Sequence, residues 1–202
     1  MTIQNIIFDF GGVLFDWDPR NLYREIFDDE QEMEYFLENI CTTHVWNLQA
    51  DAGRLTGDIT RELIEEHPKY ASQIEIFYER WEEMFSGHIH GTVDIMEALY
   101  QKKIPLYGLT NWPAEKRYYL HKSLPRLKQF KDIVVSGLEK VTKPAPAIYK
   151  ILLDRNELDP KTCLFIDDRL ENIEAAQEFG IHGHHFTTPE KLEADLQTRA
   201  LL

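Results

Sequence analysis

The sequence predicts an α/β fold: a parallel sheet covered by helices on both faces, with a helical insert near the N-terminus. Two observations lead to this fold class. Short apolar segments alternate with helix-like stretches over most of the chain, as in a doubly covered parallel sheet. One long interval, residues 16–88, breaks the alternation and carries only Glu-rich amphipathic patterns.

Five short apolar segments are the predicted strands, and each ends in polar or glycine-rich residues. They are residues 3–8, 104–109, 133–135, 163–166 and, more weakly, 181–186. Helices are predicted at residues 93–102, 114–122, 146–155 and 171–179. Pro146 suits a helix start, Gly180 suits a helix end, and Thr188 followed by Pro189 suits a capped start.

The interval without strands predicts a helical insert, with amphipathic patterns at residues 21–39, 58–66 and 74–85. Gly87, between polar residues, suits a hinge where the chain returns from the insert. The expected division is a core of residues 1–15 and 89–202 and a cap of residues 16–88.

Composition narrows the class of protein. The 202 residues include 43% apolar and 28% charged residues, which is ordinary for a folded domain, and the net charge of −13 disfavours nucleic acid as a partner. Cys41 and Cys163 lie far apart, so a reduced, cytoplasmic protein is expected. No long apolar run or leader segment is recognised, so no membrane partner is expected, and the chain is expected to be a monomer or homodimer.

Ligands of an open parallel sheet gather at the carboxyl ends of its strands, so the residues that follow each predicted strand carry the functional prediction. In chain order these are Asp9 with Gly11 and Gly12, Thr110 with Asn111, Lys143, and Asp167 with Asp168. An acid, a hydroxyl, an amine and paired acids at one edge suit phosphoryl transfer.

Each of these residues also has an ordinary structural interpretation. Asp9 can act as a nucleophile with glycines that let backbone N–H groups approach a phosphate, or it can simply stabilise a turn. Asp167 and Asp168 repel each other unless a cation lies beside them, and Mg²⁺ prefers such carboxylates. Asp168 also suits a helix N-cap, and Lys143 suits either a phosphate ligand or an exposed surface lysine.

Four motifs in this order resemble the haloacid dehalogenase-like superfamily. They are residues 8–14 (FDFGGVL), 109–111 (LTN), 143–149 (KPAPAIY) and 165–168 (FIDD) with Asn172 and Ile173. The resemblance spans nearly the whole chain. It implies a Rossmann-like three-layer parallel sheet core with an inserted all-helical cap, a Mg²⁺ cofactor and an aspartyl-phosphate intermediate. The first motif is most similar to small sugar-phosphate phosphatases of the glucose-1-phosphatase type.

The resemblance also implies roles. Asp9 is the nucleophile and a metal ligand, the Gly11 carbonyl and Asp168 are further ligands, and Asp167 lies near the metal. Thr110, Asn111 and Lys143 hold the phosphoryl group of a small phosphorylated metabolite.

One feature departs from the family pattern. Most phosphatases of the superfamily carry a second Asp two residues after the nucleophile, and this chain has Gly11 there. Either the leaving group departs unassisted, or Asp16, Asp18 or a cap histidine such as His44 supplies the proton.

Two alternatives remain at this point. A 2-haloacid dehalogenase also lacks the second acid, and Arg20 or Arg24 could supply its cap arginine, but such enzymes need no metal. A regulatory protein that binds phosphate on a weakly catalytic core is the other.

In the insert, Trp46 and Arg54 are the residues expected to face the substrate. Trp81, Phe77 and Tyr78 are expected to pack inside the insert.

The histidines 88, 90, 182, 184 and 185 lack the spacing of a closed zinc site and are expected to be exposed polar residues.

Overall fold

The computed structural model describes residues 2–202, apart from the side chains of residues 43 and 44. A five-stranded parallel sheet in the order β5-β4-β1-β6-β7 forms its centre. The strands are β1 (Asn5–Phe8), β4 (Leu106–Thr110), β5 (Asp132–Val135), β6 (Cys163–Asp167) and β7 (His182–His185). All five predicted strands are present, and the predicted α/β class is confirmed.

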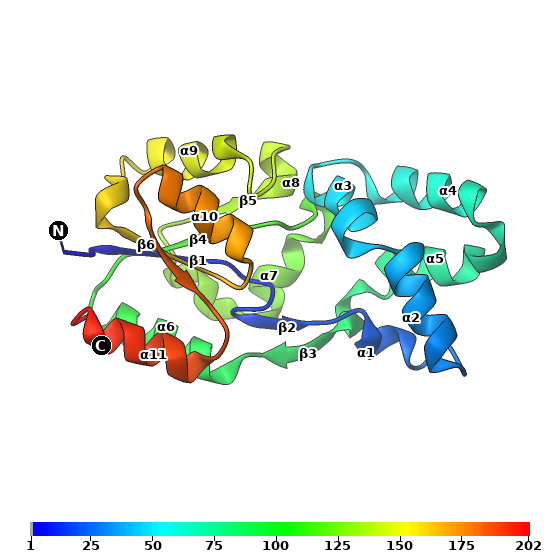
Figure 1. The fold of residues 1–202 in the computed structure, drawn as a ribbon, viewed down its shortest axis with the longest axis horizontal. Helices are drawn as coiled ribbons and strands as arrows, with labels where there is room; N and C mark the ends of the chain where they lie inside the picture. The colour runs from blue at the N-terminus through cyan, green and yellow to red at the C-terminus, as the bar shows by residue number, and fades with distance from the viewer. Residues whose placement is uncertain (1) are drawn as a thin grey trace.

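Helices cover both faces of this sheet, giving three layers (Figure 1). Ile6 and Leu164 point to a core shared with α6 (His90–Gln101), α7 (Tyr118–Ser123) and α11 (Pro189–Thr198). Their neighbours Ile7 and Phe165 point to the opposite core, shared with α9 (Pro146–Arg155) and α10 (Leu170–Glu178). Successive strand residues alternate between faces, which is why uninterrupted apolar runs form the inner strands.

Local signals at the helix ends agree with the sequence. Pro146 occupies the first turn of α9, and Gly180, with φ of 83°, follows α10. The hydroxyl of Thr188 accepts a hydrogen bond from the backbone N–H of Lys191 at 3.3 Å and caps α11. At α10, by contrast, Arg169 is the N-cap residue without a side-chain cap bond, so the capping role considered for Asp168 is wrong.

The insert forms a second hydrophobic core made only of residues between 22 and 84. Figure 1 shows it beside the sheet domain, at the carboxyl end of β1. Its helices are α1 (Arg20–Tyr23), α2 (Glu30–Asn39), α3 (Leu48–Asp51), α4 (Thr56–Glu66) and α5 (Ala71–Glu79), with a π-helical turn at Thr43–Asn47 and 3₁₀ turns at Pro68–Tyr70 and Trp81–Met84. The expected single pattern over residues 21–39 is therefore two helices, because Asp29 caps α2 by accepting from the N–H of Gln31 at 2.7 Å.

A two-stranded antiparallel ribbon joins the insert to the sheet domain. It pairs β2 (Phe15–Trp17) with β3 (Phe85–His88). The prediction placed no strand in this interval and ended a helix at residue 85, which is wrong. The strands are only three and four residues long, and their pairing depends on the chain leaving and returning side by side.

Polar contacts join the insert to the sheet domain a second time, through the segment of residues 114–122. Lys116 Nζ donates to the carbonyl oxygen of Tyr78 at 2.7 Å. Glu82 accepts from the hydroxyl of Tyr118 at 3.0 Å and from Lys122 Nζ at 2.5 Å. This segment, predicted as one helix, is a 3₁₀ turn (Ala114–Lys116) followed by α7.

Within the described residues, no helix has both the length and the apolar character that a membrane span requires.

Candidate active site

The carboxyl ends of β1, β4 and β6 bring the predicted residues to one edge of the sheet. Asp9 follows β1 directly, Thr110 ends β4 and Asp167 ends β6. These strands are neighbours, with β1 between the other two, so three distant parts of the chain meet there. All three side chains are buried.

Lys143 lies at the centre of this group. Its Nζ is 2.8 Å from Oδ1 of Asp9 and 2.7 Å from Oδ2 of Asp167. The residue is only 2% exposed. The interpretation of Lys143 as a surface lysine is therefore wrong, and its position between two buried acids is that of a fixed positive charge.

Asp167 is fully occupied by donors from the protein. Besides Lys143, it accepts from the side chain of Asn172 at 2.9 and 3.1 Å and from the backbone N–H of Arg169 at 2.8 Å. Both of its oxygens are thus engaged. This arrangement suits a residue that holds Lys143 in place more than one that binds a metal directly.

Asn111 makes two hydrogen bonds to the backbone of Lys143. Its Nδ2 donates to the carbonyl oxygen at 3.0 Å, and its Oδ1 accepts from the N–H at 2.8 Å. Asn111 therefore fixes the loop that carries Lys143, while it also lines the cavity described below. Thr110 is completely buried, and its hydroxyl has no hydrogen-bond partner in the described part of the chain.

Asp9, Asp167 and Asp168 form a cluster of the kind that holds a divalent cation. One carboxylate oxygen from each lies within 4.8 Å of the others. A hard cation such as Mg²⁺ takes one or two carboxylates together with water and phosphate oxygens, and Asp9 with the exposed Asp168 can supply them. The donor set therefore fits Mg²⁺.

Gly12 allows Asp168 to lie this close to the turn after β1. Its φ is +72°, and a Cβ built there would lie 2.6 Å from Oδ2 of Asp168. Gly11 differs, since a Cβ there would meet no atom within 4 Å. The geometry therefore requires glycine at position 12, whereas position 11 has space for a Cβ.

Burial and charge act together on the acids. Burial raises the pKa of Asp9 to about 8; Lys143 acts in the opposite direction, and the two other acids add to the rise. Partial desolvation of its carboxyl group, and then the charge of Asp167, raises the pKa of Asp168. Burial favours the neutral amine of Lys143, but Asp167 and Asp9 outweigh it and raise its pKa. Lys143 therefore stays charged. The three acids outnumber this single amine, so a bound cation would offset the remaining negative charge.

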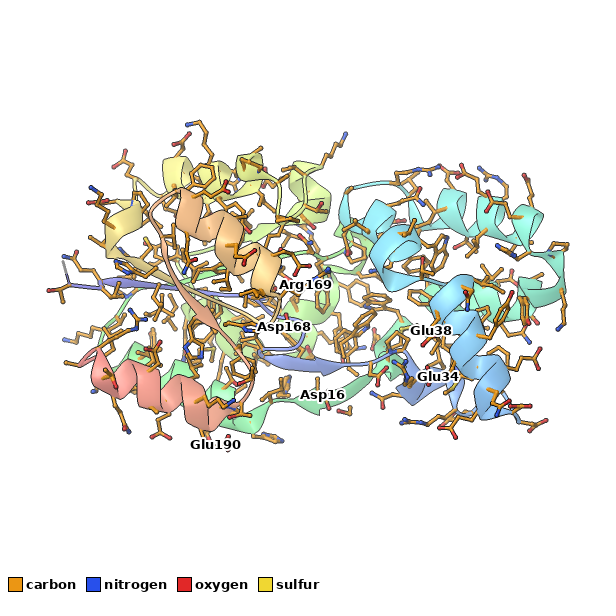
Figure 2. The ribbon with its side chains drawn as sticks, in the orientation of Figure 1. Asp16, Glu34, Glu38, Asp168, Arg169 and Glu190 are labelled. Atoms are coloured by element: carbon orange, nitrogen blue, oxygen red, sulfur yellow. The ribbon has the colours of Figure 1, made fainter. Side chains whose placement is uncertain are left out.

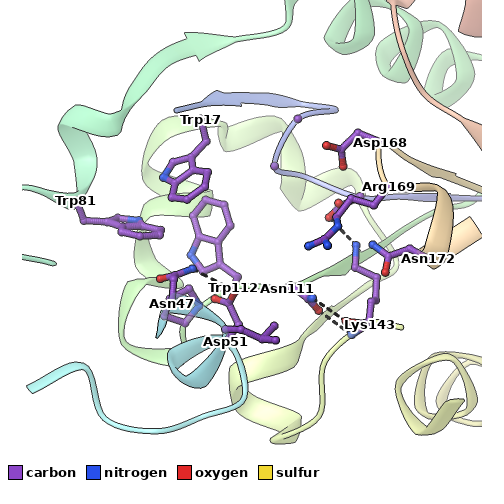
Figure 3. A pocket seen from close by; sticks show the side chains of 15 residues that line it. Trp17, Asn47, Asp51, Trp81, Asn111, Trp112, Lys143, Asp168, Arg169 and Asn172 are labelled. Atoms are coloured by element: carbon purple, nitrogen blue, oxygen red, sulfur yellow. Dashed lines mark hydrogen bonds and ion pairs between the residues drawn. The ribbon is translucent and has the colours of Figure 1, made fainter. Parts of the chain in front are cut away.

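A cavity of about 300 Å³ opens beside this cluster, where the sheet domain meets the insert (Figure 3). The sheet domain and β2 contribute Asp9, Gly11, Gly12, Trp17, Asn111, Trp112, Pro113, Lys143, Asp168, Arg169 and Asn172. The insert contributes Asn47, Leu48, Asp51 and Trp81. One end is thus charged and the other aromatic.

Three tryptophans form the aromatic end. The ring centroids of Trp17 and Trp81 are 5.4 Å apart, and those of Trp81 and Trp112 are 6.2 Å apart. Their indole N–H groups have no hydrogen-bond partner among the described residues. This wall offers apolar faces for the organic part of a ligand.

Several residues that the sequence analysis proposed as substrate contacts or proton donors lie outside this cavity. Trp46 is buried in the insert, where its Nε1 donates to the carbonyl oxygen of Ile59 at 3.1 Å. Arg54 is exposed and paired with Glu62 at 2.6 Å. Neither residue lines the cavity, so the expectation that they face the substrate is wrong.

Two of the residues proposed as proton donors, Asp16 and Asp18, do not line the cavity either. Asp16 is exposed, and Figure 2 shows it on the outer side of the ribbon, whereas Asp168 and Arg169 lie where the sheet domain meets the insert. Asp18 accepts from the N–H of Arg20 at 2.9 Å and does not line the cavity. The side chain of His44 lies outside the described residues.

The cavity residues missed by the sequence interpretation include Trp17, Asn47, Asp51, Trp81 and Trp112. Asn47 and Asp51 lie close in the sequence to Trp46 and Arg54, the two residues expected to face the substrate, but they line the cavity and those two do not. Spacing gave a partial signal, since residues four apart share a helical face and Asn47 Nδ2 donates to Asp51 Oδ2 at 3.2 Å.

The histidines expected to be exposed include His184, which instead is half-buried and 2.9 Å from Asp195.

Comparisons with known proteins agree with this architecture. A family model described as haloacid dehalogenase-like hydrolase matches residues 3–180. A sesquiterpene phosphatase from Aspergillus oryzae is 27% identical over 202 residues, covering 100% of this chain and 97% of that protein. A phosphorylated carbohydrates phosphatase from Thermotoga maritima is 27% identical, covering 89% of this chain and 82% of that protein.

Solved structures share the fold. A family enzyme from Bacteroides thetaiotaomicron, in complex with magnesium and inorganic phosphate, superimposes with a TM-score of 0.66 at 22% identity. The match covers 92% of this chain and 95% of that chain.

Proposed function

Because this chain belongs to the haloacid dehalogenase-like hydrolases, we propose that it is a Mg²⁺-dependent phosphatase acting on a small phosphorylated metabolite. The observation that carries the proposal is the contact of Lys143 Nζ with Asp9 at 2.8 Å, in a group of three acids that suits a divalent cation. Two relatives that cover 100% and 89% of the chain are named as phosphatases, which supports the same reaction class.

In this proposal Asp9 attacks the phosphorus and forms an aspartyl-phosphate. Lys143 and the buried hydroxyl of Thr110 hold phosphoryl oxygens, while Asp167 and Asn111 keep Lys143 in position. A bound Mg²⁺, held by Asp9, Asp168 and the Gly11 carbonyl, would offset the charge of the phosphoryl group. Positioning and charge stabilisation then supply most of the catalysis.

The insert defines the substrate class. Residues 16–88 serve as a cap domain over a core of residues 1–15 and 89–202. The phosphate occupies the charged end of the cavity, and the organic part packs on Trp17, Trp81 and Trp112. Sugar rings stack well on indole faces, so we favour a sugar phosphate over an apolar one.

A dehalogenase is less well supported. Neither Arg20 nor Arg24, the candidates for its cap arginine, lines the cavity, and Arg20 pairs with Glu34 at 2.6 Å. A metal-free reaction also gives no role to Asp168, the exposed member of the acidic cluster.

The test is a panel of phosphorylated sugars, nucleotides and prenyl phosphates, assayed with Mg²⁺ and with EDTA, alongside 2-chloropropionate. Release of phosphate that EDTA abolishes supports the proposal. Halide release that survives EDTA would assign a dehalogenase instead. Binding of Mg²⁺ and phosphate without turnover of any ester would assign a regulatory protein.

A further inference from the structure

The cap contributes one carboxyl group to the lining of the cavity, that of Asp51 at the end of α3. Asp51 is 7% exposed, and its Oδ2 accepts from Asn47 Nδ2 at 3.2 Å. The hydroxyl of Tyr78 donates to Asn47 Oδ1 at 2.9 Å, which fixes the orientation of that amide. The other oxygen of Asp51, Oδ1, has no partner within the described residues. A buried oxygen without a donor is poorly suited to carry charge but well suited to carry a proton.

The position of Asp51 is the one that the reaction requires of an acid. In-line displacement places the leaving oxygen on the side of the phosphorus opposite the attacking carboxylate. Asp9 attacks from the core, where Lys143 holds the phosphoryl group, so the leaving oxygen faces the cap. Figure 3 shows Asp51 across the cavity from Lys143 and Asp168.

We propose, on the basis of the phosphatase function above, that Asp51 is the general acid and base that the turn after β1 lacks. In the first half-reaction the bond from Asp9 to phosphorus forms and the bond from phosphorus to the leaving oxygen breaks. That oxygen keeps the electron pair and takes the proton of Asp51, giving a neutral alcohol and an Asp51 carboxylate. In the second half-reaction water attacks the aspartyl-phosphate, its proton passes to Asp51, and the Asp9 carboxylate departs.

The surroundings of Asp51 support its protonation before the reaction. Burial raises its pKa to about 8, and Lys143 across the cavity acts in the opposite direction. The other titratable group that interacts with it is Tyr78 of α5, whose pKa is raised by burial and then by Asp51. At neutral pH the proton is therefore held and available.

The test compares two substrates of similar size. The leaving oxygen of para-nitrophenyl phosphate needs little help from an acid, whereas that of benzyl phosphate depends on one. Asp51→Asn should lower kcat/KM for benzyl phosphate by about 10²–10⁴-fold and that for para-nitrophenyl phosphate by less than about 10-fold. Asp58→Asn, the same change at an exposed cap position, should alter neither. Equal losses for both substrates, or no loss, would overturn the role of Asp51.

Position 11 supplies a second test, because a Cβ added there meets no atom within 4 Å. Gly11→Asp should restore benzyl phosphate hydrolysis to Asp51→Asn, since the new acid replaces the lost one. In the wild-type background, which serves if Asp51→Asn does not fold, Gly11→Asp should give no gain in that rate beyond about 10-fold, because an acid is already present, whereas a gain of about 10²-fold or more would mean that no acid was present. If the wild type with Mg²⁺ hydrolyses neither substrate nor any phosphate ester of the panel, the phosphatase function itself fails, and the role of Asp51 fails with it.

Discussion

Lys143 is the residue on which the geometry of the site depends most. Two buried carboxylates and an amide from three different strand ends all bind it, so its charge lies within a network that the backbone holds from several sides. Removing one member of such a network leaves an uncompensated charge in a buried place. Neutral substitutions that keep the shape therefore probe chemistry more cleanly than truncations do.

Asp9→Asn should reduce ester hydrolysis by at least about 10⁴-fold and leave the fold intact, because the amide keeps the shape of the carboxylate but cannot attack phosphorus. Phosphate release measures the loss, and the thermal unfolding midpoint checks the fold. Asp94→Asn, an exposed position on α6, is the matched control. Turnover in Asp9→Asn close to that of the wild type would remove the covalent mechanism.

Gly12→Ala should weaken Mg²⁺ binding about 10–100-fold, because the new Cβ would displace the carboxylate of Asp168, which lies 2.6 Å from it. The positive φ of +72° should also cost about 1–3 kcal/mol of folding free energy. Calorimetric titration with Mg²⁺ and thermal unfolding measure the two effects. Gly57→Ala, in α4 with nothing within 4 Å, should instead stabilise by about 0.5–1 kcal/mol and leave Mg²⁺ binding unchanged.

Secondary structure elements differ in how clearly the sequence specifies them. The inner strands are buried on both faces, so their apolar runs stand out, and the polar residue that ends each run marks the site. The ribbon of β2 and β3 has no such signal, because Asp16, Ser86 and Gly87 are exposed and the pairing is long-range. The aromatic wall was not predicted either, since Trp17, Trp81 and Trp112 come from three separate segments that only tertiary packing brings together.

The N-cap of α2 gives a prediction at this scale. Asp29→Ala should lower the free energy of unfolding by about 1 kcal/mol, because the N–H groups of Gln31 and Glu32 lose their acceptor. Chemical denaturation followed by circular dichroism measures the change. Glu38→Ala, at an exposed position within the same helix, should shift it by less than about 0.5 kcal/mol. A similar loss in both variants would contradict the capping role.

At the scale of the whole molecule, the two buried acids Asp9 and Asp51 connect stability to pH. Burial raises both pKa values from 3.8 to about 8, so between these values the folded state binds more protons than the unfolded state. Stability in EDTA should therefore fall as pH rises from about 5 to 8, by up to about 1.4 kcal/mol per pH unit for each group.

Asp51→Asn should remove one of these two contributions and make the decline shallower. Denaturant unfolding in EDTA at several pH values measures it, with Asp58→Asn as the variant that should follow the wild-type slope. An unchanged slope in Asp51→Asn would mean that this carboxyl ionises in the folded protein as readily as in the unfolded one.

The cap is attached to the sheet domain in two ways, and this affects how substrate enters the cavity and how product leaves it. One attachment is covalent, the two chain passages of the β2–β3 ribbon, and the other consists of polar contacts from Lys116, Tyr118 and Lys122. Dissolved salt weakens the ion pair between Lys122 and Glu82 and leaves the ribbon untouched. We therefore expect that the cap moves about the ribbon more readily, and that product leaves the cavity faster, as ionic strength rises.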